Sequence, residues 1–286
     1  MFDYAALEAL CAVLSAGSFE GAARALGLTP PAVSIRIKQL EERVGAVLVI
    51  RGQPCRGTEE GLRLARHAET VALMEAELTP RASPPVLRIA VNADSLATWV
   101  IGALAEVEGR LFELVIDDQD HSAEWLKRGE VVAAVTGSGE PVAGCDVVSL
   151  GRLRYLATAS PAFVARYFPQ GPSAEAFARA PALLFNEKDR LQHDWVAALT
   201  GTRVALPCHR IGSSTAFVEA AERGLGWGMN PDRLVNRAIT AGRLVTLAPA
   251  PLEVALYWQS QRRLRAPLAP LTRAIRAAAR VGLLQV

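Results

Sequence analysis

Apolar positions early in the chain recur with the period of amphipathic helices. In residues 4–15, Leu7, Leu10 and Leu14 fall three and four positions apart, which predicts a helix that buries one face. Segment 19–26 repeats this spacing, and the serine- and glycine-containing stretch 15–18 separates the two. These residues therefore predict two short helices that bury their apolar faces in one small core.

A tight turn follows the second helix and leads into a third. Gly27 tolerates the positive φ at which helices often end, Thr29 is a good N-cap, and Pro30 fits the first helical turn. The inward apolar positions of the next segment are Val33, Ile37 and Leu40. Its other face carries side-chain types that contact phosphates and bases, namely Ser34, Arg36, Lys38 and Gln39. We therefore predict a helix-turn-helix with residues 30–43 as the DNA-recognition helix, in preference to an αα-hairpin inside a core.

A basic loop after this helix is typical of a wing. Residues 47–50 are a β-branched run, and residues 51–57 are rich in turn-forming types, which predicts a strand, a loop and a return strand. Arg51 and Arg56 would reach backbone phosphates or the minor groove from this loop. Residues 24–56 hold six basic and two acidic side chains, although the whole chain carries a net charge of only +2. This local basic surface favours DNA binding.

A long helix is expected next, over residues 58–79. Thr58 is a suitable N-cap, and acidic residues follow it in the first turn. A heptad seam runs through Leu64, Ala68, Val71 and Leu78. Such a seam favours pairing with a second copy in a homodimer or tetramer, and packing against its own domain is the alternative. The proline-rich residues 80–86 are interpreted as a hinge.

After the hinge, short strands and helices alternate, which predicts an α/β domain over residues 87–286. We expect two lobes, lobe I from residues 87–160 and 250–286 and lobe II from residues 161–249. Residues 147–150 and 153–158 read as two separate strands, and a regular helix is expected from Leu96. Because ligands bind at the carboxyl ends of strands, a small molecule should enter the cleft between the lobes.

Composition narrows the class of protein. The chain has 286 residues, of which 51% are hydrophobic, and no apolar run is long enough to cross a membrane. Four cysteines and four histidines are scattered, so we expect reduced thiols in the cytoplasm and no metal site. No nucleophile elbow, phosphate loop or His-Glu metal motif is present, so we expect no enzyme.

A second basic run, six arginines between residues 262 and 280, is interpreted as a solvated helix face.

The order of these elements resembles the LysR-type transcriptional regulators along the whole chain. The motifs that carry the resemblance at the N-terminal end are residues 32–34, 38–41, 48–51 and 58–61. Motifs in the predicted α/β domain, the sensor, are similar to those of the branch that senses lysine and arginine and activates a basic-amino-acid exporter gene. These motifs are residues 90–99, 117–122, 144–145, 224–229 and 257–259. The resemblance implies a winged helix-turn-helix, a dimerising linker helix and a two-lobed effector domain of the periplasmic-binding-protein type. It implies no cofactor beyond a small-molecule effector, and RNA polymerase as a further candidate partner.

This resemblance extends the set of DNA-facing positions. Pro31 and Ile35 depart from the residue types usual in the family, so we expect an operator that differs from those of relatives. The expected DNA-binding set is Thr29, Pro30, Pro31, Ser34, Ile35, Arg36, Lys38, Gln39, Arg51 and Arg56.

In the sensor, Thr215 stands where the branch tends to have Glu, and Asn230 stands where it tends to have an apolar residue.

A basic amino acid presents a carboxylate, an α-ammonium group and a distal cation. Hydroxyls at helix starts suit the carboxylate. The candidates are Ser95 and Thr98 at a helix of lobe I, and Ser213 and Ser214 at a helix of lobe II. Carboxylates suit the ammonium groups, and the candidate carboxylates are Asp94, Asp117, Asp118 and Asp189. Asn186 is a candidate neutral partner for the same groups. Thr136, at the end of a strand, would line the cleft. Helix capping and a solvated loop are the alternative roles for these residues.

The leading hypothesis is therefore a DNA-binding regulator that senses lysine or arginine and controls an adjacent exporter gene. The alternative is a ligand-insensitive architectural or replication-origin DNA-binding protein, which the unusual Thr215 and Asn230 would support.

Overall fold

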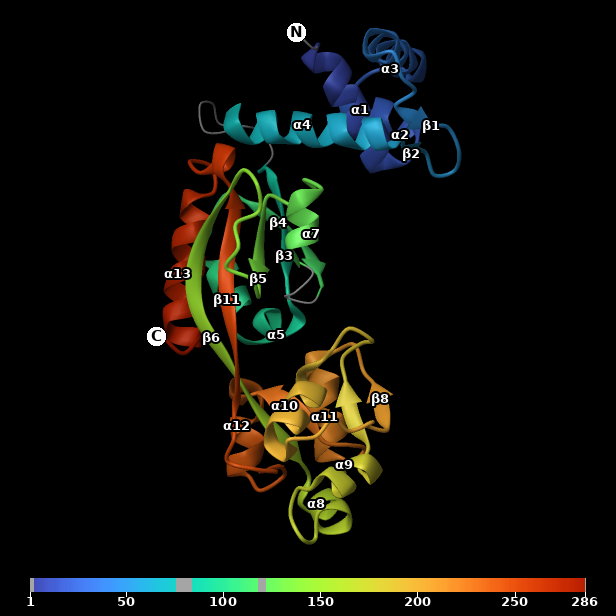
Figure 1. Cartoon of the computed structure of the whole chain (residues 1–286). Coiled ribbons are helices and arrows are strands. Elements are labelled where there is room, and N and C mark those ends of the chain that lie inside the picture. Colours follow the sequence, from blue (N-terminus) through green and yellow to red (C-terminus); the bar gives the residue numbers. More distant parts are fainter. Residues whose placement is uncertain (1–2, 76–83, 118–121, 286) are drawn as a thin grey trace. The chain divides into compact units, whose positions relative to one another are not determined.

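The computed structural model describes residues 3–75, 84–117 and 122–285, which form two compact units (Figure 1). The first unit spans Met1–Pro85 and the second Val86–Val286. None of the helices in the described ranges is both long and apolar enough to cross a membrane.

Three helices, a two-stranded wing and a fourth helix make up the first unit. They are α1 (Tyr4–Ala16), α2 (Phe19–Leu26), α3 (Pro30–Val44), β1 (Val49–Ile50), β2 (Arg56–Gly57) and α4 (Glu59–Glu75). The side chains of Asp3, Ser18 and Thr29 each accept a hydrogen bond from a backbone N–H in the first turn of the helix that follows. Gly27 ends α2 at φ 64°, a left-handed conformation that favours glycine. The helix-turn-helix prediction is therefore confirmed, with the recognition helix one residue longer than expected.

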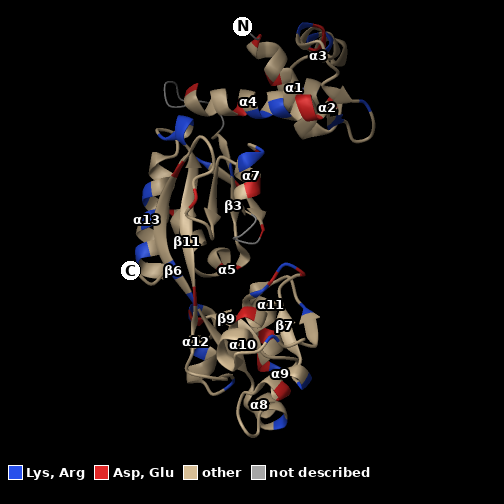
Figure 2. Cartoon of the chain, viewed as in Figure 1, with Lys and Arg blue, Asp and Glu red and all other residues tan. Residues whose placement is uncertain are grey.

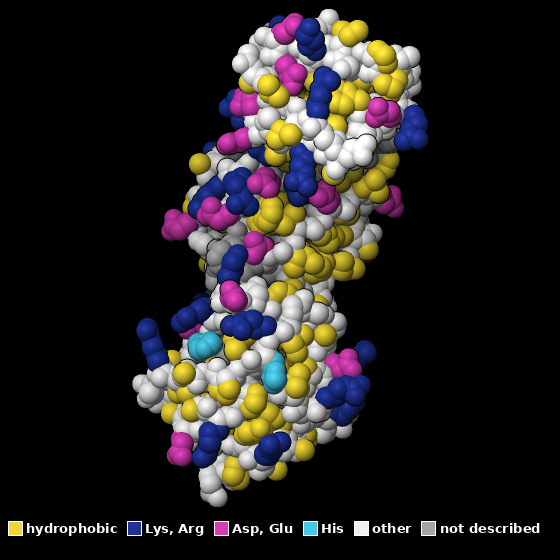
Figure 3. All heavy atoms as spheres, turned by 90° about the vertical axis from the view of Figure 1, so that its right-hand side faces the viewer, with side chains coloured by type: hydrophobic (Ala, Val, Ile, Leu, Met, Phe, Trp, Pro, Cys, Tyr) yellow, Lys and Arg dark blue, Asp and Glu magenta, His cyan; other side chains and the backbone are white. Residues whose placement is uncertain are grey.

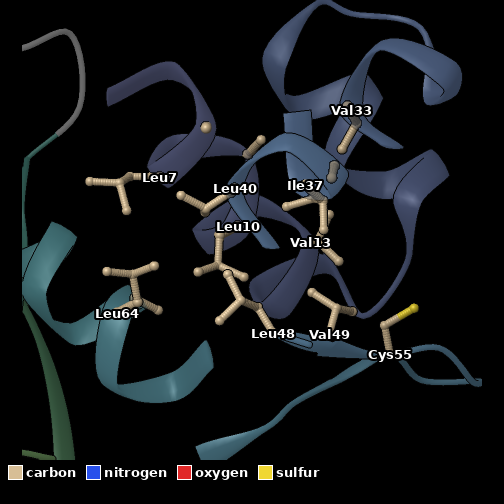
Figure 4. Packing of buried hydrophobic residues seen from close by; sticks show 14 of the residues in the cluster. Leu7, Leu10, Val13, Val33, Ile37, Leu40, Leu48, Val49, Cys55 and Leu64 are labelled. Atoms are coloured by element: carbon tan, nitrogen blue, oxygen red, sulfur yellow. The ribbon is translucent and has the colours of Figure 1, made fainter. Parts of the chain in front are cut away.

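The core of this unit is formed by the apolar faces of α1 and α3 (Figure 4). Leu10, Val33 and Ile37 are at most 1% exposed. Leu64 and Ala65 of α4 join the same cluster, so the first half of α4 packs against its own domain. The proposed seam thus has one end inside this core, and its other end, Leu78, lies outside the described residues.

The second unit begins with a parallel βαβ arrangement. Strand β3 (Val86–Val91) pairs in parallel with β4 (Leu111–Ile116) and with β5 (Ala133–Thr136). Helix α7 (Ser122–Lys127) packs on this sheet, and β11 (Leu252–Gln261) returns antiparallel to β5. These elements form lobe I, and α13 (Ala269–Gly282) packs against β6 and the helix that follows β3.

A single long strand, β6 (Cys145–Ala159), replaces the two strands predicted from the sequence. It pairs antiparallel with β11, and the register shifts where Leu256 faces Gly151 and Tyr257 faces Ser149. Leu150 is thus an extra residue in β6, a β-bulge, and Gly151 has φ 118°. The apparent break at Gly151 is therefore an irregularity inside one strand. The pair β6 and β11 connects lobe I to lobe II (Figure 1).

Lobe II surrounds the far end of β6, which pairs there with β9 (Gly228–Pro231) and β10 (Val245–Thr246). A second, parallel pair in this lobe consists of β7 (Ala182–Leu184) and β8 (Cys208–Arg210). Its helices are α8 (Pro161–Tyr167), α9 (Ala174–Arg179), α10 (Leu191–Thr200), α11 (Ser214–Glu222) and α12 (Asp232–Thr240). Helix α9 has no counterpart among the elements expected from the sequence.

The helix after β3 is also less regular than expected. It consists of α5 (Ala93–Ser95), a π-helical turn over Leu96–Val100, and α6 (Ile101–Ala105). Short π-helical turns inside α-helices are often found at functional sites. Here the turn lies directly after Asp94 and Ser95, two of the candidate effector residues.

Candidate functional site

The outer face of α3 presents most of the expected DNA-contacting residues. Thr29, Pro30 and Pro31 are exposed at its start, and the exposed fraction of Ile35 is 56%. Lys38 and Gln39 are also exposed, whereas Ser34 and Arg36 are half-buried. Figure 2 marks the positions of basic residues on α3 and on the loop between β1 and β2 in blue.

Two contacts join this helix to the wing. Glu41 Oε1 accepts hydrogen bonds from the backbone N–H of Leu48 at 2.8 Å and of Val49 at 3.2 Å. Arg51 donates to Ser34 Oγ at 3.4 Å, and its guanidinium lies 5.1 Å from the centre of the Phe19 ring. The sequence showed Glu41 as an acidic residue and as part of the motif 38–41, but it gave no sign of a contact with the wing. The contacts show that Glu41 orients the wing relative to the recognition helix.

Charges of both signs lie on the face shown in Figure 3, where basic and acidic side chains are mixed. In the second basic run, Arg262 and Arg265 both bind Asp146, at 3.0 and 2.8 Å. Arg273, Arg276 and Arg280 are exposed along α13. Their exposure fits a solvated helix face.

A pocket lies in the second unit, between the two lobes. Its lining from the lobe I side consists of Asn92, Ala93, Asp94 and Asp117. Its lining from lobe II consists of Phe185, Lys188, Asp189, Arg190, Leu191, Asp194, Ser214, Phe217, Met229, Asn230 and Pro231. The space open to water is about 100 Å³. Because one water needs about 10–15 Å³ of such space, the pocket suits a small molecule.

Asp94 joins the two lobes across this pocket. Its Oδ1 accepts a hydrogen bond from Ser214 Oγ at 2.7 Å, and its Oδ2 accepts one from the Tyr155 hydroxyl at 2.9 Å. Ser214 is the first residue of α11, and Tyr155 lies on β6. A carboxylate of lobe I is thus held at the N-terminus of a lobe II helix.

Asp117, at the end of β4, makes a second connection between the lobes. Its Oδ2 accepts a hydrogen bond from Trp125 Nε1 at 2.9 Å, and its Oδ1 lies 3.6 Å from Lys188 Nζ of lobe II. Asp118 lies outside the described residues. Asp94 and Asp117 are therefore the candidate carboxylates that face lobe II, and both already interact with it.

Asp189 lines the pocket but is bound by its own loop. Its carboxylate accepts hydrogen bonds from the backbone N–H of Phe185 at 2.8 Å and of Leu191 at 3.1 Å. Burial raises the pKa of Asp189, and these hydrogen bonds oppose the shift by stabilising the charged form. Asn186, outside the pocket lining, accepts from the N–H of Lys188 at 2.8 Å, so both side chains shape the loop.

Several expected hydroxyls lie outside the pocket lining. Thr98 donates to the Asp94 carbonyl at 2.6 Å, within its own helix. Thr136 donates to the Ser138 carbonyl and accepts from Gln259, both in lobe I. Ser213 caps α11 by accepting from the N–H of Ala216. Ser95 is fully buried, and no hydrogen-bond partner for its hydroxyl is found within the described residues.

Sequence reasoning missed several pocket residues. Asn92 is 3% exposed, and its Oδ1 has no hydrogen-bond partner among the residues that the structure describes. Its position directly after β3 was the available signal. Asn230, noted above only as an unusual residue, lines the pocket and donates to Thr158 Oγ1 at 3.0 Å. Lys188 and Arg190 were also missed.

The pocket wall has an excess of negative charge. Four aspartates line it, against one lysine and one arginine. The arrangement is suited to a small ligand with more positive than negative groups, since carboxylates stabilise ammonium and guanidinium groups by charge-assisted hydrogen bonds.

Comparison with known proteins defines the class. Residues 4–62 match the bacterial regulatory helix-turn-helix proteins of the LysR family, and residues 81–280 match the LysR substrate binding domain. The chain therefore belongs to the LysR family of transcriptional regulators, DNA-binding proteins that are not enzymes.

Particular relatives are similar along almost the whole chain. The transcriptional regulator ArgP of Pseudomonas aeruginosa is 43% identical over 100% of this chain and 99% of its own. The regulator LysG of Mycobacterium tuberculosis is 43% identical over 96% of this chain and 92% of its own. Among solved structures, ArgP of Mycobacterium tuberculosis superposes with a TM-score of 0.85 at 42% identity, covering 100% of this chain and 99% of that one. The structure of LysG of Corynebacterium glutamicum with bound effector Arg superposes with a TM-score of 0.71 at 37% sequence identity. The match covers 99% of this chain and 100% of that one.

Proposed function

We propose that this LysR-family regulator senses a basic amino acid, arginine or lysine, in the cleft of its second unit and controls an adjacent amino-acid exporter gene. The observation that carries the proposal is the carboxylate-rich wall around Asp94 and Asp117. The similarity to LysG, whose structure holds arginine as its effector, supports the choice of ligand.

The pocket offers a partner for each group of such a ligand. The α-carboxylate fits the N-terminus of α11 and the Ser214 hydroxyl, because backbone N–H groups at a helix start attract anions. The α-ammonium group fits Asp94, which already lies beside Ser214, and Asn92 Oδ1, an acceptor without a hydrogen-bond partner in the described part of the chain. The distal cation fits Asp117. Binding then exchanges the hydrogen bond between Asp94 and Ser214 for bonds to the ligand.

Ligand binding would change the regulator because the pocket wall comes from both lobes. A ligand that favours one lobe arrangement shifts the population toward it by the difference in its binding free energy for the two arrangements. In the proposal, this changes how a homodimer or tetramer presents its winged helices to two half-sites. The DNA-binding set expected from the sequence supplies the contacts. As a regulator of genes, the protein would act in the cytoplasm, with RNA polymerase as a candidate partner.

Self-association would use α4 and its continuation in the 58–79 linker, followed by the hinge 80–86. Exposed apolar side chains on the first unit support this part of the proposal. Tyr4 at the start of α1 is 55% exposed, and Met74 near the end of α4 is 42% exposed. A dimer that buries these side chains would remove their apolar surface from water.

Titration calorimetry on the full-length protein tests the sensing function. We expect arginine or lysine to bind, and citrulline, which lacks the distal charge, to bind more weakly. If no amino acid in a panel gives a heat of binding, the result contradicts the proposal. Such a result would favour the ligand-insensitive architectural protein, in which the lobes serve only assembly.

A further inference from the structure

One contact in the pocket joins a carboxylate to a cation of the protein itself. Lys188 Nζ of lobe II lies 3.6 Å from Asp117 Oδ1 of lobe I. The Asp117 side chain is 21% exposed and the Lys188 side chain 50%, so the pair lies at the rim of the pocket, within reach of solvent. Asp117 Oδ2 accepts a hydrogen bond from Trp125 Nε1, and Asp117 Oδ1 is the oxygen closest to the cation in this ion pair.

The loop that carries Lys188 is held in place by its own hydrogen bonds. Asn186 Oδ1 accepts from the N–H of Lys188 at 2.8 Å and from the N–H of Asp189 at 3.1 Å. The Asp189 carboxylate binds the N–H groups of Phe185 and Leu191 on either side. Two of the polar residues expected to bind effector thus fix the backbone from which Lys188 reaches the cleft.

We propose that Lys188 is an internal competitor for the effector's distal cation. The inference rests on the proposed function, since it assigns Asp117 to that cation. An ammonium group on a flexible chain is the same chemical group as the end of lysine, and it occupies the carboxylate that a basic amino acid requires. The ligand must displace it, so Lys188 weakens the binding of arginine and lysine by the same factor. A neutral analogue does not compete for Asp117, and Lys188 leaves its affinity unchanged.

The consequence is a higher threshold of response. A regulator of an exporter needs to act only when its amino acid accumulates, and a displaceable internal cation raises the concentration at which the pocket fills. A partly exposed ion pair contributes modestly in water, so the expected weakening is about threefold.

Arg190 provides a matched control. It lines the same pocket and carries the same charge, but it pairs with Asp194 at 3.8 Å on its own side of the cleft. Removing Arg190 changes the charge of the pocket wall as much as removing Lys188 does, but it leaves the cation beside Asp117 in place. A difference between the two variants therefore separates displacement from a general electrostatic effect.

The test is calorimetric titration of the full-length protein with arginine, lysine and citrulline. We expect Lys188→Met to bind arginine and lysine about threefold more tightly, with the affinity for citrulline unchanged. Arg190→Met should gain less affinity for arginine and lysine than Lys188→Met does, because it changes only the total charge of the pocket wall. In an Asp117→Asn background, Lys188→Met should have no effect on arginine affinity, because the two residues act on the same contact.

Weaker arginine binding by Lys188→Met would overturn the inference and show that Lys188 holds the ligand instead. An equal gain for Lys188→Met and Arg190→Met, or unchanged affinities, would also overturn it while leaving the proposed function intact. If neither the natural protein nor Lys188→Met binds a basic amino acid, both the inference and the proposed function fail.

Discussion

Asp94 Oδ1 accepts a hydrogen bond of 2.7 Å from Ser214 Oγ, across 120 residues of sequence and from one lobe to the other. Asp94 is the second residue of α5, the first helix of lobe I, and Ser214 begins α11 of lobe II. The starts of two helices thus meet at one carboxylate, as the proposed binding of an amino acid zwitterion requires.

Asp94→Asn should reduce the affinity for arginine by at least about tenfold, because it removes a charge-assisted hydrogen bond to the α-ammonium group. Titration calorimetry measures the change. Asp194→Asn is the control, since Asp194 also lines the pocket but is exposed and paired with Arg190. Equal losses in the two variants would mean that the pocket responds only to its total charge.

Glu41→Ala should weaken specific DNA binding although it removes a negative charge from a basic surface. The substitution leaves the N–H groups of Leu48 and Val49 without their acceptor, which costs about 1–3 kcal/mol and loosens the wing. Glu42→Ala is the control, because Glu42 is exposed and pairs only with Lys38 among the ion pairs found in the described residues. Gel shifts should show weaker binding for the first variant and equal or tighter binding for the second. The opposite order would exclude a structural role of Glu41.

Lys38→Ala should reduce the salt dependence of DNA binding. Each phosphate contact contributes a slope of about −0.9 in a plot of log affinity against log salt, so the slope should become shallower by about one. Lys127→Ala is the control, since Lys127 lies on α7 in the second unit and pairs with Glu124. Fluorescence anisotropy at several salt concentrations makes the comparison. An unchanged slope in Lys38→Ala would remove Lys38 from the DNA interface.

Acid stability should depend on Asp146. Hydrogen bonds from Arg265 and Arg262 lower the pKa of Asp146 below the 3.8 that applies to the unfolded chain. The charged carboxylate therefore stabilises the folded state above pH 3.8, and this contribution is lost as the pH falls through the lowered pKa. Asp146→Asn should lower the melting temperature at neutral pH and converge with the natural protein in acid. A constant difference across the pH range would contradict this account.

The DNA-binding unit was predictable because its signals are local. Thr29, Gly27 and the spacing of Val33, Ile37 and Leu40 act within a few residues, and the structure keeps each in its expected role. The wing strand was shorter than expected, β1 covering only Val49–Ile50, because Leu48 faces the core and its N–H is bound by Glu41. That contact joins positions seven residues apart and leaves no periodic pattern.

The cleft was only partly predictable because its contacts are distant in sequence. Asp94 and Ser214 were identifiable, since each stands at the start of a helix after a strand. The hydroxyl of Thr136 was expected in the cleft because it ends a strand, but Gln259, 123 residues away, binds it inside lobe I. Lys188 gave no signal, because an exposed lysine in a loop gains a role only when the folded lobes bring Asp117 to it.

A footprint of the full-length protein on the promoter region beside its own gene, with and without arginine, tests effector sensing and DNA binding together. Arginine should change the protected region, and Asp94→Asn should bind the same DNA with no response to arginine. A footprint of the natural protein that is identical at all arginine and lysine concentrations would contradict effector sensing.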